Sequence, residues 1–368
     1  MLHIIFYIKT HISIGNYDIS KGEGMTIDLG HVQTMRNEFF NALEVIFPSV
    51  AVGKTAYDVA DHDNSLNFRL LRYGDDKNGN RILFIIPHII NRPYILDLND
   101  DISVIRRFCE HGFSVYMFDW GYPAMKQSKV CFLDYVNYMD RAVNSVCRER
   151  EIKRISIMGY CTGGIISLMY ASIYPEKVEK LILLATPVDF SSWYDPRILW
   201  GKTFDVRKVV SLFGNVPGEL IFLYGRNLFM YYLPFFSMNA EFNKEILTYE
   251  SWRDAFRMNR WFFDTPMIPG SLYIQFIEDC YKQNLLINNE MKIDSQTIDL
   301  RKIRCPLLNI LAKYDHIVPL SSGKALKDVY SGKDYEEIVF PSSHTGLSVS
   351  REAHEKLWPK VCKWLDNS

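Results

Sequence analysis

A cysteine stands between glycines at the point where one apolar run ends and another begins. The segment "GYCTG" (residues 159–163) follows the β-type run Ile155–Met158 and precedes a run with helical spacing. A strand, a sharp turn and a helix in this order form the setting of a nucleophile elbow, G-x-S-x-G, here with Cys161 in place of serine. Gly159 and Gly163 allow neighbouring backbones to approach, and a helix N-terminus favours thiolate over thiol. The pattern alone also fits a structural cysteine at a glycine-rich turn.

An aspartate and a histidine follow the cysteine, each directly after an apolar run in the last part of the chain. Asp315 follows "LLNIL" in "AKYDHIVP", and His344 follows "EEIVF" in "PSSHTG". A thiol nucleophile needs a general base, and the base needs an orienting group. Elbow enzymes carry these groups in the order nucleophile, acid, histidine. The sequence therefore predicts a triad of Cys161, Asp315 and His344. His316 is a competing base, but neighbours on an extended segment point apart, so we treat it as secondary.

Two backbone N–H groups are expected to hold the negative charge that develops on the substrate oxygen. The first belongs to Thr162, directly after the nucleophile. The second usually comes from a loop after an earlier strand, and "PHIINR" (residues 87–92) is that loop here. Ile90 is the predicted donor, with a shift of one residue left open. An ordinary connecting loop is the alternative.

The elements that must position these residues are short apolar runs alternating with helical patterns. The expected strands are Ile82–Ile86, Ser114–Phe118, Ile155–Met158, Leu181–Leu184, Leu307–Leu311 and Glu337–Phe340. The expected helices are Asp101–His111, Phe132–Arg150, Gly163–Tyr174, Gly323–Tyr330 and Arg351–Leu365. Continuous Val/Ile/Leu runs indicate strands buried on both faces. Strand and helix in alternation predict an α/β fold with a mainly parallel central sheet wrapped by helices.

One region, about 190–290, breaks this alternation. Residues 193–281 carry 22 of the chain's 52 aromatic residues. The region lies between the fourth and fifth expected strands, and open α/β sheets bind ligands at the carboxyl ends of their strands. We therefore expect a cap or lid inserted into a catalytic domain of residues 51–368. A second helical lobe with its own core is the alternative.

The N-terminal residues 1–50 are expected to form an extension and a helix ahead of that domain. The segment after Met25, "TIDLGHVQTMRNEFFNALEVIF", has an amphipathic helical pattern, and residues 1–24 read as a loosely attached extension. The first apolar block is too short to span a bilayer, and no cleavage site follows a basic region. We therefore predict neither a transmembrane protein nor a secreted one.

The bulk composition excludes several classes of function. Apolar residues make up 48% and charged residues 23%, as in an ordinary globular protein. A formal charge of −1 gives no reason to expect nucleic acid as a partner. The cysteines stand at 109, 131, 147, 161, 280, 305 and 362. None forms a CxxC pair and no Cys/His cluster has zinc spacing, so we expect no metal and a reducing, cytosolic compartment.

With these motifs in view, the chain resembles the polyhydroxyalkanoate synthases from about Val52 to Leu365. The segments that carry the resemblance are "INRPYILDL" (90–98), "DWGYP" (119–123), "GYCTGG" (159–164), "TPVDF" (186–190), "GNVPGEL" (214–220), "DHIVP" (315–319) and "SSHTG" (342–346). In that family the lipase-like box carries cysteine, and the catalytic Asp and His fall on Asp315 and His344. The resemblance implies an α/β-hydrolase fold. It also implies the short, partner-dependent type of catalytic subunit, which works with a second subunit of the PhaE or PhaR kind.

The resemblance further implies a cytoplasmic acyltransferase located at polyester granules. It would polymerise (R)-3-hydroxyacyl-CoA, with 3-hydroxybutyryl-CoA as the expected monomer, and release CoA through acyl-Cys intermediates. No cofactor is expected, since CoA is part of the substrate and a product. The aromatic cap would keep water out and could line a product exit or a homodimer contact. The alternative is a Cys-nucleophile hydrolase, either a thioesterase or an enzyme of the dienelactone-hydrolase type.

Overall fold

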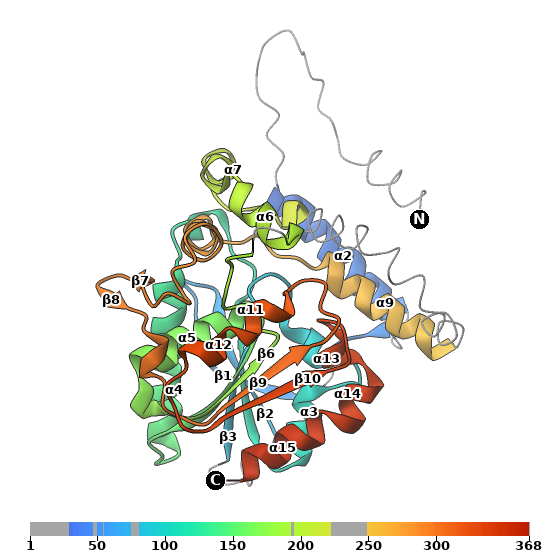
Figure 1. The fold of residues 1–368 in the computed structure, drawn as a ribbon. Coiled ribbons are helices and arrows are strands. Elements are labelled where there is room, and N and C mark those ends of the chain that lie inside the picture. Colours follow the sequence, from blue (N-terminus) through green and yellow to red (C-terminus); the bar gives the residue numbers. More distant parts are fainter. Residues whose placement is uncertain are drawn as a thin grey trace.

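Eight strands form one central sheet in the computed structural model, which describes residues 29–46, 50–53, 55–74, 81–192, 195–221 and 249–367 (Figure 1). The order across the sheet is β1-β2-β4-β3-β5-β6-β9-β10. The strands are β1 Tyr57–Asp63, β2 Phe68–Tyr73, β3 Ile82–Ile86, β4 Ser114–Asp119, β5 Ile155–Tyr160, β6 Val178–Leu184, β9 Leu307–Ala312 and β10 Tyr335–Phe340. From β4 to β10 neighbouring strands are parallel. The predicted mostly parallel sheet is confirmed.

The central strands are buried on both faces. Strands β3, β4, β5 and β9 are buried along their whole length, as their continuous apolar runs predict. Side chains on successive strand residues alternate between the two faces. Phe84 accordingly belongs to one hydrophobic cluster, while Leu83 and Ile85 belong to the other. The sheet thus separates two cores, and each core needs a layer of helices to cover it.

Helices cover both faces of the sheet. One cluster is built with α4 (Phe132–Glu149) and α5 (Thr162–Ile173). The other is built with α3 (Val104–Glu110) and, near the C-terminus, α13 Gly346–Val349, α14 Arg351–Lys356 and α15 Trp358–Asp366. Figure 1 shows these two layers on opposite sides of the strands. Because the helices cover both faces, a ligand site is expected in the loops at the carboxyl ends of the strands.

Three predicted helices differ from those in the structure by more than one residue at an end. Helix α3 begins at Val104 rather than at residue 101, because the Ser103 side chain caps it by accepting from the N–H of Arg106. The predicted helix 323–330 is two short helices, α11 Leu320–Lys324 and α12 Leu326–Val329. The predicted helix 351–365 divides into α14 and α15, with a proline in the first turn of α15.

An antiparallel hairpin, β1–β2, extends the sheet and was not predicted. It pairs Tyr57 with Tyr73 and Asp63 with Phe68, and β2 then pairs antiparallel with β4. Strand β1, with the sequence "YDVADHD", lies at the edge and is largely exposed. An exposed edge strand buries little apolar surface, so it lacks the apolar run by which the other strands were recognised.

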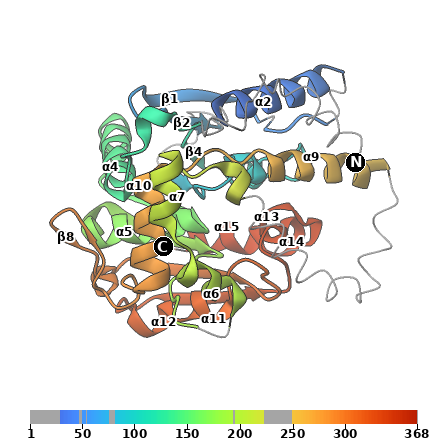
Figure 2. The same cartoon turned by 90° about the horizontal axis from the view of Figure 1, so that it is seen from above.

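A long insertion leaves the sheet after β6 and returns at β9. These two strands are neighbours, with Leu181 paired to Leu307. The insertion contains α6 Pro196–Thr203, α7 Val206–Phe213, α9 Tyr249–Phe263, α10 Gly270–Gln275, a π-helix Phe276–Lys282, a small hairpin of β7 Lys292–Ile293 and β8 Gln296–Thr297, and a 3₁₀ turn Leu300–Lys302. Figure 2 shows α7 lying beside α10. Residues 222–248 of the predicted cap lie outside the described residues, and its role as a lid stays a prediction.

The helix expected near the N-terminus is α2 (Leu29–Ile46). Glu44 on α2 pairs with Arg260 on α9, which holds the two helices side by side (Figures 1 and 2). The predicted loose extension, residues 1–24, lies outside the described residues. Within the described ranges, no helix is both long enough and apolar enough to cross a bilayer.

Candidate active site

The elbow predicted around Cys161 is a strained turn between β5 and α5. Cys161 has φ 53° and ψ −120°, a conformation that side-chain-bearing residues rarely adopt. Its N–H donates to the carbonyl of Leu184 at 2.8 Å, and its carbonyl accepts from the N–H of Gly164 at 2.9 Å. The neighbouring strand and the first helical turn therefore hold this backbone in place. The turn directs the cysteine out of the strand at the carboxyl edge of the sheet.

The glycines of the elbow are required by space. A Cβ on Gly159 would lie 2.5 Å from the Cα of Gly164, inside any real contact distance. A Cβ on Gly163 would overlap the carbonyl oxygens of Ile86 and Pro87 at the end of β3. Helix α5 thus begins in direct contact with the strand and loop beside it. A side chain at Gly163 would push the elbow away from the end of β3, and one at Gly159 would push α5 away from β5.

Asp315 and His344 meet in the structure, although they follow different strands. Nδ1 of His344 lies 2.8 Å from Oδ2 of Asp315, and both side chains are nearly fully buried. The other carboxylate oxygen, Oδ1, accepts from the backbone N–H groups of Ile317 and Val318 at 2.8 and 2.7 Å. The turn "DHIVP" therefore fixes the carboxylate, and the carboxylate orients the imidazole. In its neutral form this imidazole carries its proton on Nδ1, which leaves Nε2 able to accept one.

The charges around His344 favour its protonated form. Burial, the largest single influence, lowers the pKa of His344, while the negative charge of Asp315 and its hydrogen bond to the ring raise it. The charge of Cys161 and its hydrogen bond to the ring act in the same direction, so the pKa lies above the ordinary value of 6.5. Cys161 and His344 are therefore in contact range. Since Cys161 is 6% exposed, the pair interacts with little screening by water.

The remaining cysteines have the environments of inert thiols. All seven cysteines are free. Burial raises the pKa of Cys305 and Cys362 to about 12, and that of Cys109 to about 11. None of these three is bonded to an imidazole among the described residues, so they stay protonated near neutral pH.

A hydrogen bond joins the two segments that carry the predicted oxyanion donors, the start of α5 and the loop after β3. Thr162 is the first residue of α5, where an N–H has no acceptor within the helix. Its side-chain oxygen accepts from the N–H of Ile89 at 3.0 Å, so the amide of Ile89 is already used. The N–H of Asn91 donates to Nδ1 of His88 at 3.1 Å. Ile90, between them, has no hydrogen-bond acceptor for its N–H in the described part of the chain, and it stays the predicted second donor.

Sequence reasoning missed the residues that anchor this loop. The side chain of Asn91 donates to Oγ1 of Thr265 at 2.8 Å and to the carbonyl of Trp261 at 3.2 Å. Nε1 of Trp261 donates to the carbonyl of Arg92 at 2.8 Å. Helix α9 and the turn after it are therefore tied to the loop that carries Ile90. The segment "INRPYILDL" marked this loop, but only the folded chain shows what it contacts.

Arg92 also belongs to a buried ion-pair cluster at the end of β4. Asp119 accepts from Arg92 and Arg69, and Oδ1 also accepts from the N–H of Gly121 at 3.0 Å. Burial by itself raises the pKa of Asp119, but the two guanidinium groups hold it below the ordinary value of 3.8. Asp119 is thus ionised at neutral pH and fastens β2, β4 and the Ile90 loop together.

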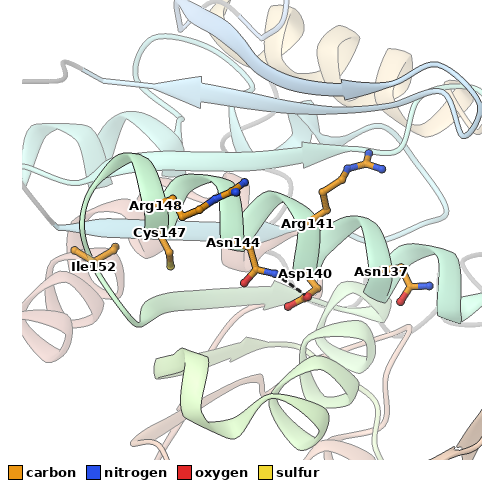
Figure 3. A pocket seen from close by; sticks show the side chains of 7 residues that line it. All are labelled: Asn137, Asp140, Arg141, Asn144, Cys147, Arg148 and Ile152. Atoms are coloured by element: carbon orange, nitrogen blue, oxygen red, sulfur yellow. Dashed lines mark hydrogen bonds between the residues drawn. The ribbon is translucent and has the colours of Figure 1, made fainter.

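Other polar groupings in the described residues offer no competing chemistry. No group of three or more His, Cys, Asp or Glu residues there is placed to hold a metal ion. An open hollow lies on helix α4, lined by Asn137, Asp140, Arg141, Asn144, Cys147, Arg148 and Ile152 (Figure 3). None of the predicted triad lines it, and Asp140 is paired with Lys177 at 2.6 Å. The hollow is separate from the Cys161 site.

Comparison with known proteins places this geometry in a family. The model of the alpha/beta hydrolase fold family matches residues 95–349. The poly(3-hydroxyalkanoate) polymerase subunit PhaC of Thiocystis violacea is 36% identical over 289 residues, which cover 77% of this chain and 80% of that protein. The chain belongs to the PhaC family. The PhaC of Haloarcula marismortui is 35% identical over 355 residues, 93% of this chain and 73% of that one.

The fold is also found outside the PhaC family. A monoacylglycerol lipase from Paleococcus ferrophilus superposes with a TM-score of 0.53 at 13% identity, covering 81% of this chain and 98% of the lipase. At that identity the likeness concerns the fold alone. It confirms the predicted α/β-hydrolase fold, on which this PhaC family member carries cysteine at the elbow.

Proposed function

We propose that this chain is a polyester synthase that polymerises (R)-3-hydroxyacyl-CoA and releases CoA. The observation that carries the proposal is a cysteine at a strained elbow, hydrogen-bonded to a buried histidine that a carboxylate orients. A thiolate exchanges one thioester for another at little cost in free energy, which suits repeated acyl transfer. Membership of the PhaC family supports the proposed substrate class, since the relatives are named poly(3-hydroxyalkanoate) polymerase subunits.

In the first step His344 accepts the thiol proton of Cys161, and the thiolate attacks the thioester carbon of the substrate. The amides of Thr162 and Ile90 hold the carbonyl oxygen while it carries negative charge. The bond from carbon to the CoA sulfur then breaks, and the protonated His344 returns its proton to the departing CoA thiolate. Cys161 is left as an acyl thioester.

In the second step His344 accepts the proton of the 3-hydroxyl of an incoming unit. The hydroxyl oxygen attacks the acyl-Cys carbon of the growing chain, an ester bond forms, and Cys161 leaves as a thiolate. Asp315 orients His344 and stabilises its positive charge in both steps. The oxygen nucleophile has to compete with water, so the site must be kept dry.

The insertion between β6 and β9 is proposed as the cap that excludes water. Its helix α9 delivers Trp261, whose indole is bonded to the backbone of the Ile90 loop. Burial of Cys161 and His344 agrees with a shielded site. Exchange of substrate and polymer then requires movement around the site, since the nucleophile is only 6% exposed.

An assay with 3-hydroxybutyryl-CoA tests this function directly. The expected products are free CoA and an insoluble polyester, and Cys161→Ala is expected to give neither product and no acyl adduct. Cys305→Ala is the matched control, because Cys305 is buried outside the site and should leave acylation intact. Release of CoA together with monomeric acid would point to a thioesterase instead. The absence of both CoA and polymer would exclude an enzyme of this class.

A second synthase subunit of the PhaE or PhaR kind is part of the proposal. The purified chain alone is expected to show a long lag or weak polymerisation, which such a subunit should relieve. Full immediate activity without it would contradict the dependence. We also propose a cytoplasmic location at polyester granules and a homodimer, which granule fractionation and light scattering of the purified chain would check.

A further inference from the structure

His88 is a buried polar side chain at the active site that the proposed mechanism does not use. It lies in the loop after β3 and is 5% exposed. Its Nδ1 accepts the N–H of Asn91 at 3.1 Å, so this nitrogen carries no proton. A neutral ring then carries its proton on Nε2, and Nε2 has no hydrogen-bond partner among the described residues. Buried N–H groups are nearly always bonded, so this one calls for an explanation.

The surroundings of His88 keep it neutral. Burial, and then the positive charge of His344, lower the pKa of His88 to about 3. The ring is therefore an imidazole with a single donor across the working pH range. A cation at this position would oppose the protonated form of His344, whereas a neutral N–H donor does not.

The loop around His88 is fixed against the elbow. In the sheet Ile86 pairs with Gly159. The N–H of Ile89 is bonded to the side chain of Thr162. His88 lies between these two contacts, so the backbone places it beside the nucleophile.

The ring of His88 contacts the walls of the Cys161 site. Its centroid lies 5.2 Å from that of Tyr160, the residue before Cys161, and 5.7 Å from that of Trp261. Tyr160 in turn stacks on His344 at 5.4 Å. Because Nδ1 faces the loop backbone, Nε2 on the opposite side of the ring faces away from the loop, among these side chains.

We propose that the Nε2–H of His88 donates a hydrogen bond to the acyl carbonyl oxygen of the substrate at Cys161, as a side-chain member of the oxyanion hole. The missing partner of this buried donor is then the substrate itself. The bond strengthens as negative charge develops on the oxygen, which stabilises the transition state more than the bound substrate. This inference rests on the acyl transfer proposed above.

Three substitutions separate this role from packing. In His88→Gln the amide nitrogen takes roughly the place of Nε2 and keeps the donor. In His88→Asn the amide oxygen takes roughly the place of Nδ1, so the contact with Asn91 remains while the donor is lost. His88→Phe keeps the ring contacts with Tyr160 and Trp261 but loses both nitrogens.

The readout is CoA release from 3-hydroxybutyryl-CoA, with kcat and KM measured separately and the thermal midpoint recorded for each variant. We expect His88→Asn and His88→Phe to lower kcat and kcat/KM together, by about 10²-fold if one oxyanion donor is lost. His88→Gln should retain most of the activity. The midpoint of His88→Asn should stay close to that of the wild type.

Several outcomes would overturn the inference. One is a wild-type kcat in His88→Asn. Another is an equal loss of kcat in His88→Gln and His88→Asn, which is expected if the Nε2–H only points at the ring face of Tyr160 or Trp261. If His88→Gln does not fold, His88→Asn decides alone. A wild-type protein that releases no CoA would remove the proposed function and this inference together. If the wild type releases CoA and the His88 variants keep its kcat, only this inference is removed and the proposed function stands.

Discussion

Two buried aspartates stand at the carboxyl edge of the sheet, and their partners give them opposite properties. Asp119 ends β4 and is bonded to Arg69, Arg92 and a backbone N–H. Asp315 follows β9 and is bonded to His344 and two backbone N–H groups. Both carboxylates are surrounded by donors. A guanidinium does not lose its proton in proteins, whereas an imidazole does. The ion pairs of Asp119 therefore have a structural role, whereas the Asp315–His344 pair can transfer a proton.

The largest expected effect is the loss of activity in Asp315→Asn. Without the negative charge, the tautomer and orientation of His344 are no longer fixed, and CoA release should fall by about 10⁴-fold. The variant should still fold, because an asparagine oxygen can still accept from Ile317 and Val318. The measurement is a single-turnover assay with chromatographic detection of CoA, beside a melting curve. Activity within a few fold of the wild type would remove Asp315 from the mechanism.

A large loss of stability is expected in Asp119→Asn. The change leaves Arg92, which is 12% exposed, without its counter-charge, and such losses cost about 3–5 kcal/mol. Urea unfolding followed by circular dichroism measures this. Asp58→Asn is the matched control, since Asp58 is 76% exposed in its pair with Arg72 and its loss should cost no more than about 1 kcal/mol. Equal losses at Asp119 and Asp58 would show that the buried ion pairs of Asp119 contribute no more to stability than an exposed pair.

A smaller effect is expected in the pH dependence of stability. The folded pKa of His344 lies above 6.5, so its contribution to stability is complete below pH 6.5 and is lost as the pH rises through the folded value. The difference in unfolding free energy between the wild type and Asp315→Asn should therefore shrink above pH 6.5, by up to about 1.4 kcal/mol per pH unit. The difference between the wild type and Asp119→Asn should stay level there, because neither arginine titrates. A level difference at Asp315 as well would contradict the raised pKa.

The contrast also explains what the sequence could predict. Cys161 was recognised because an elbow is local, with glycines at fixed offsets from the nucleophile. Asp315 and His344 were recognised because parallel strands bring the residues that follow them to one edge. The structure brings them together as expected, while their catalytic roles stay proposals.

The Asp119 cluster could not be recognised in this way. Its members come from β2, β4 and the loop after β3, and only the strand order brings them together. Strand β2 belongs to the hairpin that was not predicted, so the sequence did not place Arg69 on a strand next to β4. The contact of His88 with Trp261 has the same character, since it joins a strand loop to a helix of the insertion. Side-chain partners of this kind depend on packing between distant segments.

The insertion starts and finishes at neighbouring strands, β6 and β9, and this has a consequence for how such enzymes diversify. The two strands pair directly with each other, so the ladder between them does not depend on the residues that intervene. Lineages can therefore lengthen, shorten or replace this stretch while the thiol and imidazole keep their places. Such changes are limited by Trp261 and Thr265, because these residues of the insertion fasten the loop that carries Ile90.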